Sequence, residues 1–427
     1  MRIALISNTC NNNFAFLRYL LDLGIDTHLF LYSNEGKEDS NPIHSPSWDS
    51  FSADQFQNHI SYLDIPNGLI SVIGRPDRLK FPLSLKSFSK AISGYDICVG
   101  SGLTPAIFKR IKRRLDVFYP YGIGIEWVGD NMMLKKLSTI NLEFPFRKLL
   151  LHYQVEGLRD SRKIINWMPG HTENVLRRLS IPFELMHVPV YYPERTDLPP
   201  ENALKKLNNS LIKKITNEKT FKIFSFMRHM WVFDSNNYDH QTWPDNNKNN
   251  NLLIIGFKKF IEQFPNRDIK LFLSEWGPDL NESKKLISDL SINEYVEWLP
   301  LLPRSNVSYI LSKYAQLAVG EFIISPYETW GSTSWECIAL GVPFMQSVNF
   351  SNDYFKTKFG YKLPPQILDV KSIEDVTSHI ISCYSKFNLS SSKEQENINW
   401  FNSYNSYALA KRWLKIFEEI KENKKEN

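Results

Sequence analysis

Two glutamates flank a turn of small residues in the C-terminal half of the chain. Glu328 precedes Gly331, and Glu336 follows three small hydroxyl residues at 332–334. Hydroxyl residues can open a helix, so this turn would present free backbone N–H groups and the positive end of a helix dipole, both of which suit a phosphate. Two carboxylates would repel that phosphate unless ligand hydroxyls donate hydrogen bonds to them. The stretch therefore predicts a site for a polyol joined to a phosphate, and a nucleotide-sugar meets that description.

Two cations upstream of this turn could meet the same phosphates. Arg228 follows the largely apolar run 224–227, at the carboxyl end of an expected strand, where open α/β sheets bind their ligands. A planar guanidinium pairs with two phosphate oxygens and would stabilise the charge that a departing diphosphate gains. Lys248 stands shortly before an expected helix and is a second candidate.

The elements that must position these groups alternate between strand and helix in both halves of the chain. Apolar runs predict strands at 2–7, 27–32, 96–99, 117–119, 164–168, 184–190, 222–226, 269–274, 296–299, 317–319 and 343–346. Amphipathic runs predict helices at 14–23, 173–179, 252–264, 282–290, 307–314, 332–340 and 400–420. Such alternation implies parallel sheets with right-handed crossovers. The predicted fold class is α/β, with two Rossmann-like, doubly wound domains facing each other across a cleft.

Prolines divide the two series. They interrupt the alternation at positions 193, 199 and 200, which gives predicted domains of 1–197 and 198–402. A last helix at about 403–427 is expected to return to the first domain. The length supports two domains, because the chain has 427 residues, 42% of them hydrophobic, whereas single cores stop growing near roughly 250 to 300 residues.

Composition narrows the class of protein. The formal charge of +5 is modest, and Lys and Arg gather only in the tail at 421–425, so nucleic acid is not an expected partner. The four cysteines lie far apart, without disulfide or metal-ligand spacing, which favours a reducing cytoplasm. No signal peptide and no membrane-spanning run is predicted, so any membrane contact would be peripheral.

Three other kinds of site are not expected. The first turn, at 8–13, carries asparagines where a dinucleotide enzyme has G-x-G-x-x-G, and a Walker lysine loop is missing. The ionisable residues of the insertion that follows Arg228 have no recognised metal-ligand spacing, so no metal is predicted there. They are His229, Asp234, His240 and Asp245.

The stretch 328–343 resembles a known motif. It reads E-x-W-G-x4-E-C-x-A-x-G-x-P, and group 1 glycosyltransferases of the GT-B fold carry E-x-F-G-x4-E-A-x-A-x-G-x-P, the Glu-x7-Glu motif. Trp330 replaces Phe and Cys337 replaces Ala. The resemblance extends loosely over the C-terminal half, while the N-terminal half matches in pattern. It implies a retaining glycosyltransferase, most simply a hexosyltransferase, that uses a nucleotide-diphosphate sugar and no cofactor.

The resemblance also implies roles for the donor-side residues. Glu328 would hold the donor sugar and, with Arg228, forms the predicted catalytic pair, while Glu336 would hold the ribose hydroxyls. Lys248 begins a segment similar to the family's K-G-x-D/N-x-L-I, without its glycine. Pro278 ends a segment similar to the family's G-x-G-P turn. The full donor-binding set is Glu336, Lys248, Thr329, Gly331, Ser332, Thr333, Ser334 and Pro278.

On the acceptor side, the resemblance implies that the first domain binds a glycan or lipid-linked acceptor, in bacterial surface polysaccharide or lipopolysaccharide assembly. Loops that end strands should approach it. Where relatives often carry a histidine, this chain offers Glu126. The candidate acceptor residues are Asn11, Asn12, Gly102, Tyr121 and Glu126.

Several alternatives stay open. A nucleotide-sugar epimerase or a glycan phosphorylase of the same fold would differ in whether product formation needs an acceptor. A catalytically silent glycan-binding subunit would fit the replaced family glycines. Basic and apolar residues interleave at 78–90 and 134–148, which fits either peripheral contact with the inner face of an anionic membrane or ordinary amphipathic helices.

Overall fold

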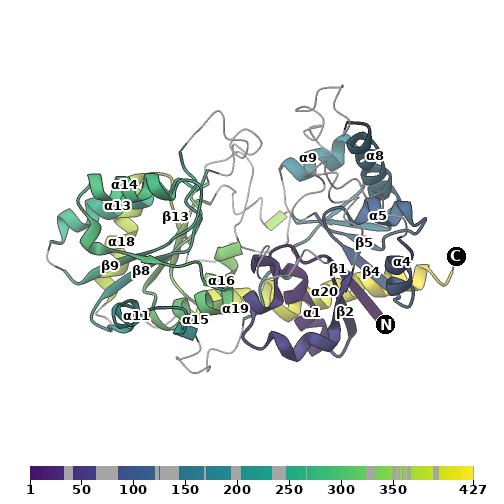
Figure 1. Ribbon diagram of the computed structural model, residues 1–427, viewed down its shortest axis with the longest axis horizontal. Coiled ribbons are helices and arrows are strands. Elements are labelled where there is room, and N and C mark those ends of the chain that lie inside the picture. Colours follow the sequence, from purple (N-terminus) through teal and green to yellow (C-terminus); the bar gives the residue numbers. More distant parts are fainter. Residues whose placement is uncertain are drawn as a thin grey trace. The chain divides into compact units, whose positions relative to one another are not determined.

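The computed structural model describes residues 1–32, 42–63, 85–120, 125, 144–167, 170–193, 203–232, 247–265, 267–323, 332–348, 353, 356–357, 360, 362, 367–387 and 394–426. The chain divides into two compact units (Figure 1), one of Met1–Tyr192 with Asn405–Asn427 and one of Pro193–Tyr404. The boundary expected at residue 197 lies five residues after Tyr192. Each unit is a domain built around its own parallel sheet.

The first domain contains a seven-stranded sheet in the order β3-β2-β1-β4-β5-β6-β7, and every pairing is parallel. Its strands are β1 (Arg2–Ile6), β2 (Asp26–Tyr32), β3 (Ile60–Leu63), β4 (Ile97–Gly100), β5 (Val117–Phe118), β6 (Lys163–Asn166) and β7 (Glu184–Leu185). Its helices are α1 (Asn12–Asp22), α2 (Pro46–Asp49), α4 (Lys86–Ile92), α5 (Thr104–Arg110), α8 (Phe144–Asp160) and α9 (His171–Arg178). Short 3-10 turns are η1 (Thr9–Asn11), η2 (Pro42–His44) and η3 (Ala53–His59).

The second domain contains a six-stranded parallel sheet in the order β10-β9-β8-β11-β12-β13. Its strands are β8 (Phe221–Ser225), β9 (Ile269–Ser274), β10 (Val296–Leu299), β11 (Leu317–Val319), β12 (Phe344–Gln346) and β13 (Ile367–Asp369). Its helices are α11 (Asn209–Thr216), α13 (Asn250–Gln263), α14 (Leu280–Asp289), α15 (Arg304–Tyr314), α16 (Ser332–Leu340), α18 (Ile373–Phe387) and α19 (Gln395–Tyr404), with a turn η6 (Asn293–Tyr295).

Helices cover both faces of the second sheet. In Figure 1, α13 and α14 lie on one side of its strands, and α11 and α15 lie on the other. Strands covered on both faces need no polar alternation, which is why β8 is buried at all five positions. α13 and α18 approach so closely that a Cβ on Gly256 would lie 2.6 Å from Cγ1 of Val376. The predicted doubly wound α/β architecture is therefore confirmed in both domains.

The C-terminal segment differs from the single helix predicted at 400–420. The chain breaks at Asn405 into α19 and α20 (Ser406–Asn423), where the Asn405 side chain accepts a hydrogen bond from the Ser406 N–H at 2.8 Å. Helix α20 belongs to the first domain. The buried Trp413 indole N–H donates to the His187 carbonyl at 2.9 Å, and Lys424 Nζ lies 2.6 Å from Oδ1 of buried Asp116. Among the described residues, no helix is long and apolar enough to cross a membrane.

Candidate active site

The strand order of the second domain changes direction between β8 and β11. These neighbours are the first and fourth strands of the sheet in chain order. In open α/β sheets, ligands bind outside the carboxyl ends of the strands at such a switch point. The segments 226–232 and 320–323 leave the sheet here, and α13 begins beside them. The candidate donor site is built from these three segments and from α15 and α16.

The segment after β8 is joined to the segment after β9 by main-chain hydrogen bonds. The His229 N–H donates to the Trp276 carbonyl at 2.9 Å, and the Asp279 N–H donates to the His229 carbonyl at 3.1 Å. The Asp279 carboxylate in turn accepts the Trp231 N–H at 2.6 Å. These bonds fix the backbone directly after Arg228 and so restrict where its guanidinium can lie.

His229 belongs to this hydrogen-bonded segment. Its side chain is buried, and Nδ1 lies 2.8 Å from the Ser283 hydroxyl. Burial lowers the pKa of His229 to about 4, so the ring is neutral near pH 7. In the described ranges no three His, Cys, Asp or Glu side chains gather in a way that could hold a metal ion.

Arg228 is a partly exposed cation at the switch point. Its Nη2 lies 2.8 Å from Sδ of Met230. No carboxylate of the described chain lies within ion-pair distance of its guanidinium, which therefore keeps its hydrogen-bond donors available to an anion. This is the side chain that the sequence singled out for a diphosphate.

Lys248 already has a carboxylate partner. Its Nζ lies 2.6 Å from Oε1 of Glu321, which follows β11, so this ion pair joins the two sides of the switch point. The next residue, Asn249, has a left-handed backbone with φ of 48°, and its side-chain amide donates to the Phe322 carbonyl at 2.6 Å. Glu321 was not among the predicted residues, although its place two residues after a predicted strand is a signal that could have found it.

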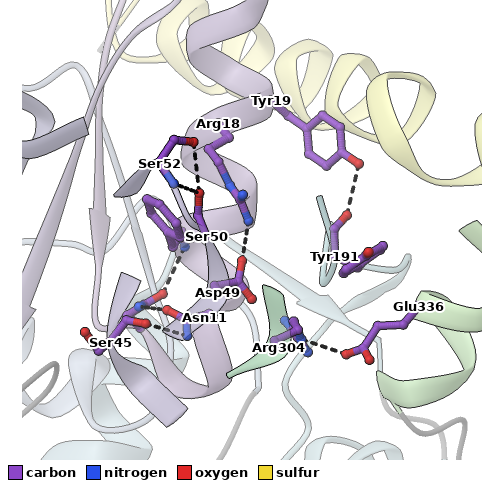
Figure 2. Close-up of polar contacts among 12 residues, drawn as sticks. Asn11, Arg18, Tyr19, Ser45, Asp49, Ser50, Ser52, Tyr191, Arg304 and Glu336 are labelled. Atoms are coloured by element: carbon purple, nitrogen blue, oxygen red, sulfur yellow. Dashed lines mark hydrogen bonds and ion pairs between the residues drawn. The ribbon is translucent and has the colours of Figure 1, made fainter. Parts of the chain in front are cut away.

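Glu336 lies inside α16, where it is buried and paired with an arginine. Oε1 of Glu336 lies 2.7 Å from Nε of Arg304, with side-chain exposures of 8% and 12%, and Figure 2 shows the two side chains pointing toward each other. Arg304 opens α15 shortly after β10 and was also missed by the sequence analysis. The pair gives the predicted ribose-binding carboxylate a fixed position and a balancing charge.

The remaining donor-side candidates have different surroundings. The Ser334 hydroxyl is buried and hydrogen-bonded to Oε1 of Gln346, and Thr333 is partly exposed. Pro278 is exposed in the segment after β9. Ser332 is the first residue of α16. Outside the described residues lie Glu328, Thr329, Gly331, Tyr121 and Glu126.

The first domain has its own switch point, between β1 and β4. Asn11 is buried there, and its Nδ2 donates to the carbonyls of Ile43 and Ser45 at 3.0 and 2.9 Å, the second of which is drawn in Figure 2. Its side chain therefore holds the 43–45 segment in place. Asn12 is buried as well, whereas Gly102 is partly exposed with φ of 58° and its carbonyl accepts from Gln154.

Comparison with known proteins yields structural likeness alone. No protein-family model and no curated sequence matches the chain. A glycosyltransferase from Rickettsia africae ESF-5 superposes with a TM-score of 0.57 at 13% identity, covering 98% of both chains. The pneumococcal O-GlcNAc transferase GtfA, solved with UDP and GlcNAc, gives 0.55 at 10% identity over 98% of this chain and 99% of its own. WaaG, a glycosyltransferase involved in lipopolysaccharide biosynthesis, superposes with a TM-score of 0.53 at 11% identity, covering 97% of this chain and 99% of its own. The fold is GT-B.

The described charged residues of this GT-B chain are arranged differently in its two domains. In the second domain the carboxylates of Glu321 and Glu336 are each neutralised by a cation, and Arg228 adds a further positive charge. In the first domain the ion pair of Arg18 and Asp49 is internally balanced and buried. Among these described residues of the second domain, Arg228 is the cation without a carboxylate at ion-pair distance.

Proposed function

We propose that this chain is a retaining glycosyltransferase whose second domain binds a nucleotide-diphosphate sugar. The observation that carries the proposal is the cation Arg228, which lies at the switch point of a GT-B domain without a carboxylate partner among the described residues. A guanidinium there suits a diphosphate, because it can donate two parallel hydrogen bonds to phosphate oxygens. The UDP complex named for GtfA and the lipopolysaccharide role named for WaaG support the same donor class and setting.

The proposed mechanism assigns one task to each group. Arg228 and the backbone N–H groups at the start of α16 stabilise the negative charge that grows on the departing diphosphate. Glu336, held by Arg304, accepts hydrogen bonds from the ribose hydroxyls. Glu328 orients the donor sugar, a role that rests on the motif. The acceptor is a hydroxyl of a glycan or lipid-linked glycan in bacterial surface polysaccharide assembly.

Thermal unfolding of the protein with a panel of nucleotide-diphosphate sugars tests this function. One nucleotide series should raise the unfolding temperature, because a ligand at about a hundred times its dissociation constant adds roughly 2.7 kcal/mol to the free energy of unfolding. The free nucleoside, which lacks the diphosphate, is the control and should have little effect. If no member of the panel shifts the transition, the chain has no such donor site.

Glu321→Gln is expected to tighten the binding of UDP. In the free protein the Glu321 carboxylate forms an ion pair with Lys248. A diphosphate must therefore compete with this carboxylate for Lys248, and the carboxylate also repels it. Removing the charge should strengthen binding by about 1 to 2 kcal/mol, which is roughly five- to thirtyfold in the dissociation constant from calorimetry. Glu275→Gln, which breaks an exposed pair with Lys284, is the matched control and should leave the affinity unchanged. Weaker binding by Glu321→Gln would mean that Glu321 supports the ligand instead of competing with it.

A further inference from the structure

Met230 links the two cations that the sequence analysis assigned to the diphosphate. Residues 229–247 separate Arg228 from Lys248 along the chain. Despite this separation, the Lys248 N–H donates to the Met230 carbonyl at 2.7 Å, and Nη2 of Arg228 lies 2.8 Å from the Met230 sulfur. One buried residue therefore contacts the side chain of one cation and the main chain of the other.

The Met230 main chain is held at both of its polar groups. Its carbonyl accepts the Lys248 N–H, and its own N–H donates to Oδ1 of buried Asn250 at 3.1 Å. Asn250 is the first residue of α13, so these two bonds tie Met230 to the start of that helix. The side chain of Met230 is 0% exposed, and close packing therefore restricts the sulfur to its place beside Arg228.

The sulfur is a neutral acceptor, unlike the partners of the other two cations at the candidate site. Lys248 is paired with Glu321 and Arg304 with Glu336, so a carboxylate balances the charge of each. A thioether sulfur carries no charge and accepts hydrogen bonds weakly. The contact therefore restrains the direction of the Arg228 guanidinium but leaves its positive charge intact, and the N–H groups that do not face the sulfur can still donate to an anion.

Such a restraint favours binding, because a long side chain loses conformational freedom when a ligand immobilises it. That loss costs roughly a factor of two to ten in affinity, and a side chain that is already held avoids most of it. We propose that Met230 is a positioning residue of the donor site, whose thioether holds the Arg228 guanidinium in place for the diphosphate without neutralising it. This role rests on the proposed function, because it takes the diphosphate as the ligand of Arg228.

Met230→Leu, measured in the full chain with and without Arg228→Ala, tests this role. Leucine has a similar volume but no sulfur, so Met230→Leu should weaken UDP binding roughly two- to tenfold in calorimetry while the unfolding temperature changes little. In the Arg228→Ala background the same substitution should have no further effect on affinity, because the guanidinium that the sulfur restrains is gone. Met227→Leu is the matched control and should bind UDP as the wild type does, since Met227 packs in the apolar core of the second domain.

A pair of variants with the same shape tests whether the acceptor must be neutral. Met230→Gln places a neutral amide near Arg228, whereas Met230→Glu places a carboxylate there that can pair with the guanidinium and repel a diphosphate. Met230→Glu should therefore bind UDP more weakly than Met230→Gln in the same calorimetric measurement.

Three results would each overturn the role of Met230. They are unchanged UDP binding by Met230→Leu, an equally large loss in the Arg228→Ala background, and binding by Met230→Glu that is at least as tight as that of Met230→Gln. Each of them leaves the donor proposal standing as long as Arg228→Ala alone weakens UDP binding. If Arg228→Ala binds UDP as the wild type does, the donor role of Arg228 is wrong, and the role of Met230 fails with it.

Discussion

Arg228→Ala is expected to weaken UDP binding by roughly ten- to a hundredfold and to remove most transfer activity. A charge-assisted hydrogen bond contributes about 1.5 to 3 kcal/mol, and about 1.4 kcal/mol corresponds to a factor of ten in affinity. The fold should survive, because the described contact of the guanidinium is with Sδ of Met230. Calorimetry with UDP measures the loss, and the unfolding temperature reports on the fold.

Two further variants make this result specific to the site. Arg228→Lys keeps the charge but loses the planar pair of donors, so its affinity should lie between those of the wild type and Arg228→Ala. Arg267→Ala removes an exposed arginine of the same domain and should bind UDP normally. Glu328→Gln, by the motif, should lose turnover while UDP binding persists. Unchanged UDP binding by Arg228→Ala would show that the diphosphate, if it binds at all, lies elsewhere.

The candidate donor site shows which of its residues a sequence can reveal. Arg228 and Glu336 were predicted because their signals are local, one at the end of a strand and the other within a spaced motif. Arg304 and Glu321 escaped notice because their importance comes from partners 32 and 73 residues away, in Glu336 and Lys248, which only the folded chain brings near. A carboxylate shortly after a strand of an α/β sheet is visible in the sequence, but its partner is not.

The strands also fall into those that the sequence predicted and those that it did not. Central strands were predicted because burial on both faces makes them continuous apolar runs. The edge strands β3 and β13 escaped prediction, since Ile60–Leu63 and Ile367–Asp369 are short and only partly buried. The break at Asn405 was missed because apolar spacing continues through it. Ser406, with a backbone φ of 56°, shows that the chain leaves the helical conformation there.

Gly277→Ala is expected to cause the largest loss of stability among single substitutions near the donor site. Gly277 has φ of 126°, and a Cβ at this position would lie 2.3 Å from the carbonyl oxygen and 2.4 Å from the nitrogen of His229. Both atoms are backbone, so no side-chain rotation can relieve the clash. The main-chain hydrogen bonds between the segments after β8 and β9 would have to break or lengthen, which should lower the free energy of unfolding by about 2 to 4 kcal/mol.

Gly360→Ala separates that clash from ordinary backbone strain. Gly360 also has a positive φ, of 74°, but no atom of the described residues lies within 4 Å of the position that its Cβ would take. Its substitution should cost about 1 kcal/mol, close to the conformational term alone. Because the Gly277 contact fixes the backbone beside Arg228, Gly277→Ala should weaken UDP binding as well, whereas Gly360→Ala should not. Equal unfolding temperatures for the two variants would mean that the segments after β8 and β9 can separate freely. The backbone beside Arg228 would then not be fixed, and the role proposed for Arg228 depends on that fixed backbone.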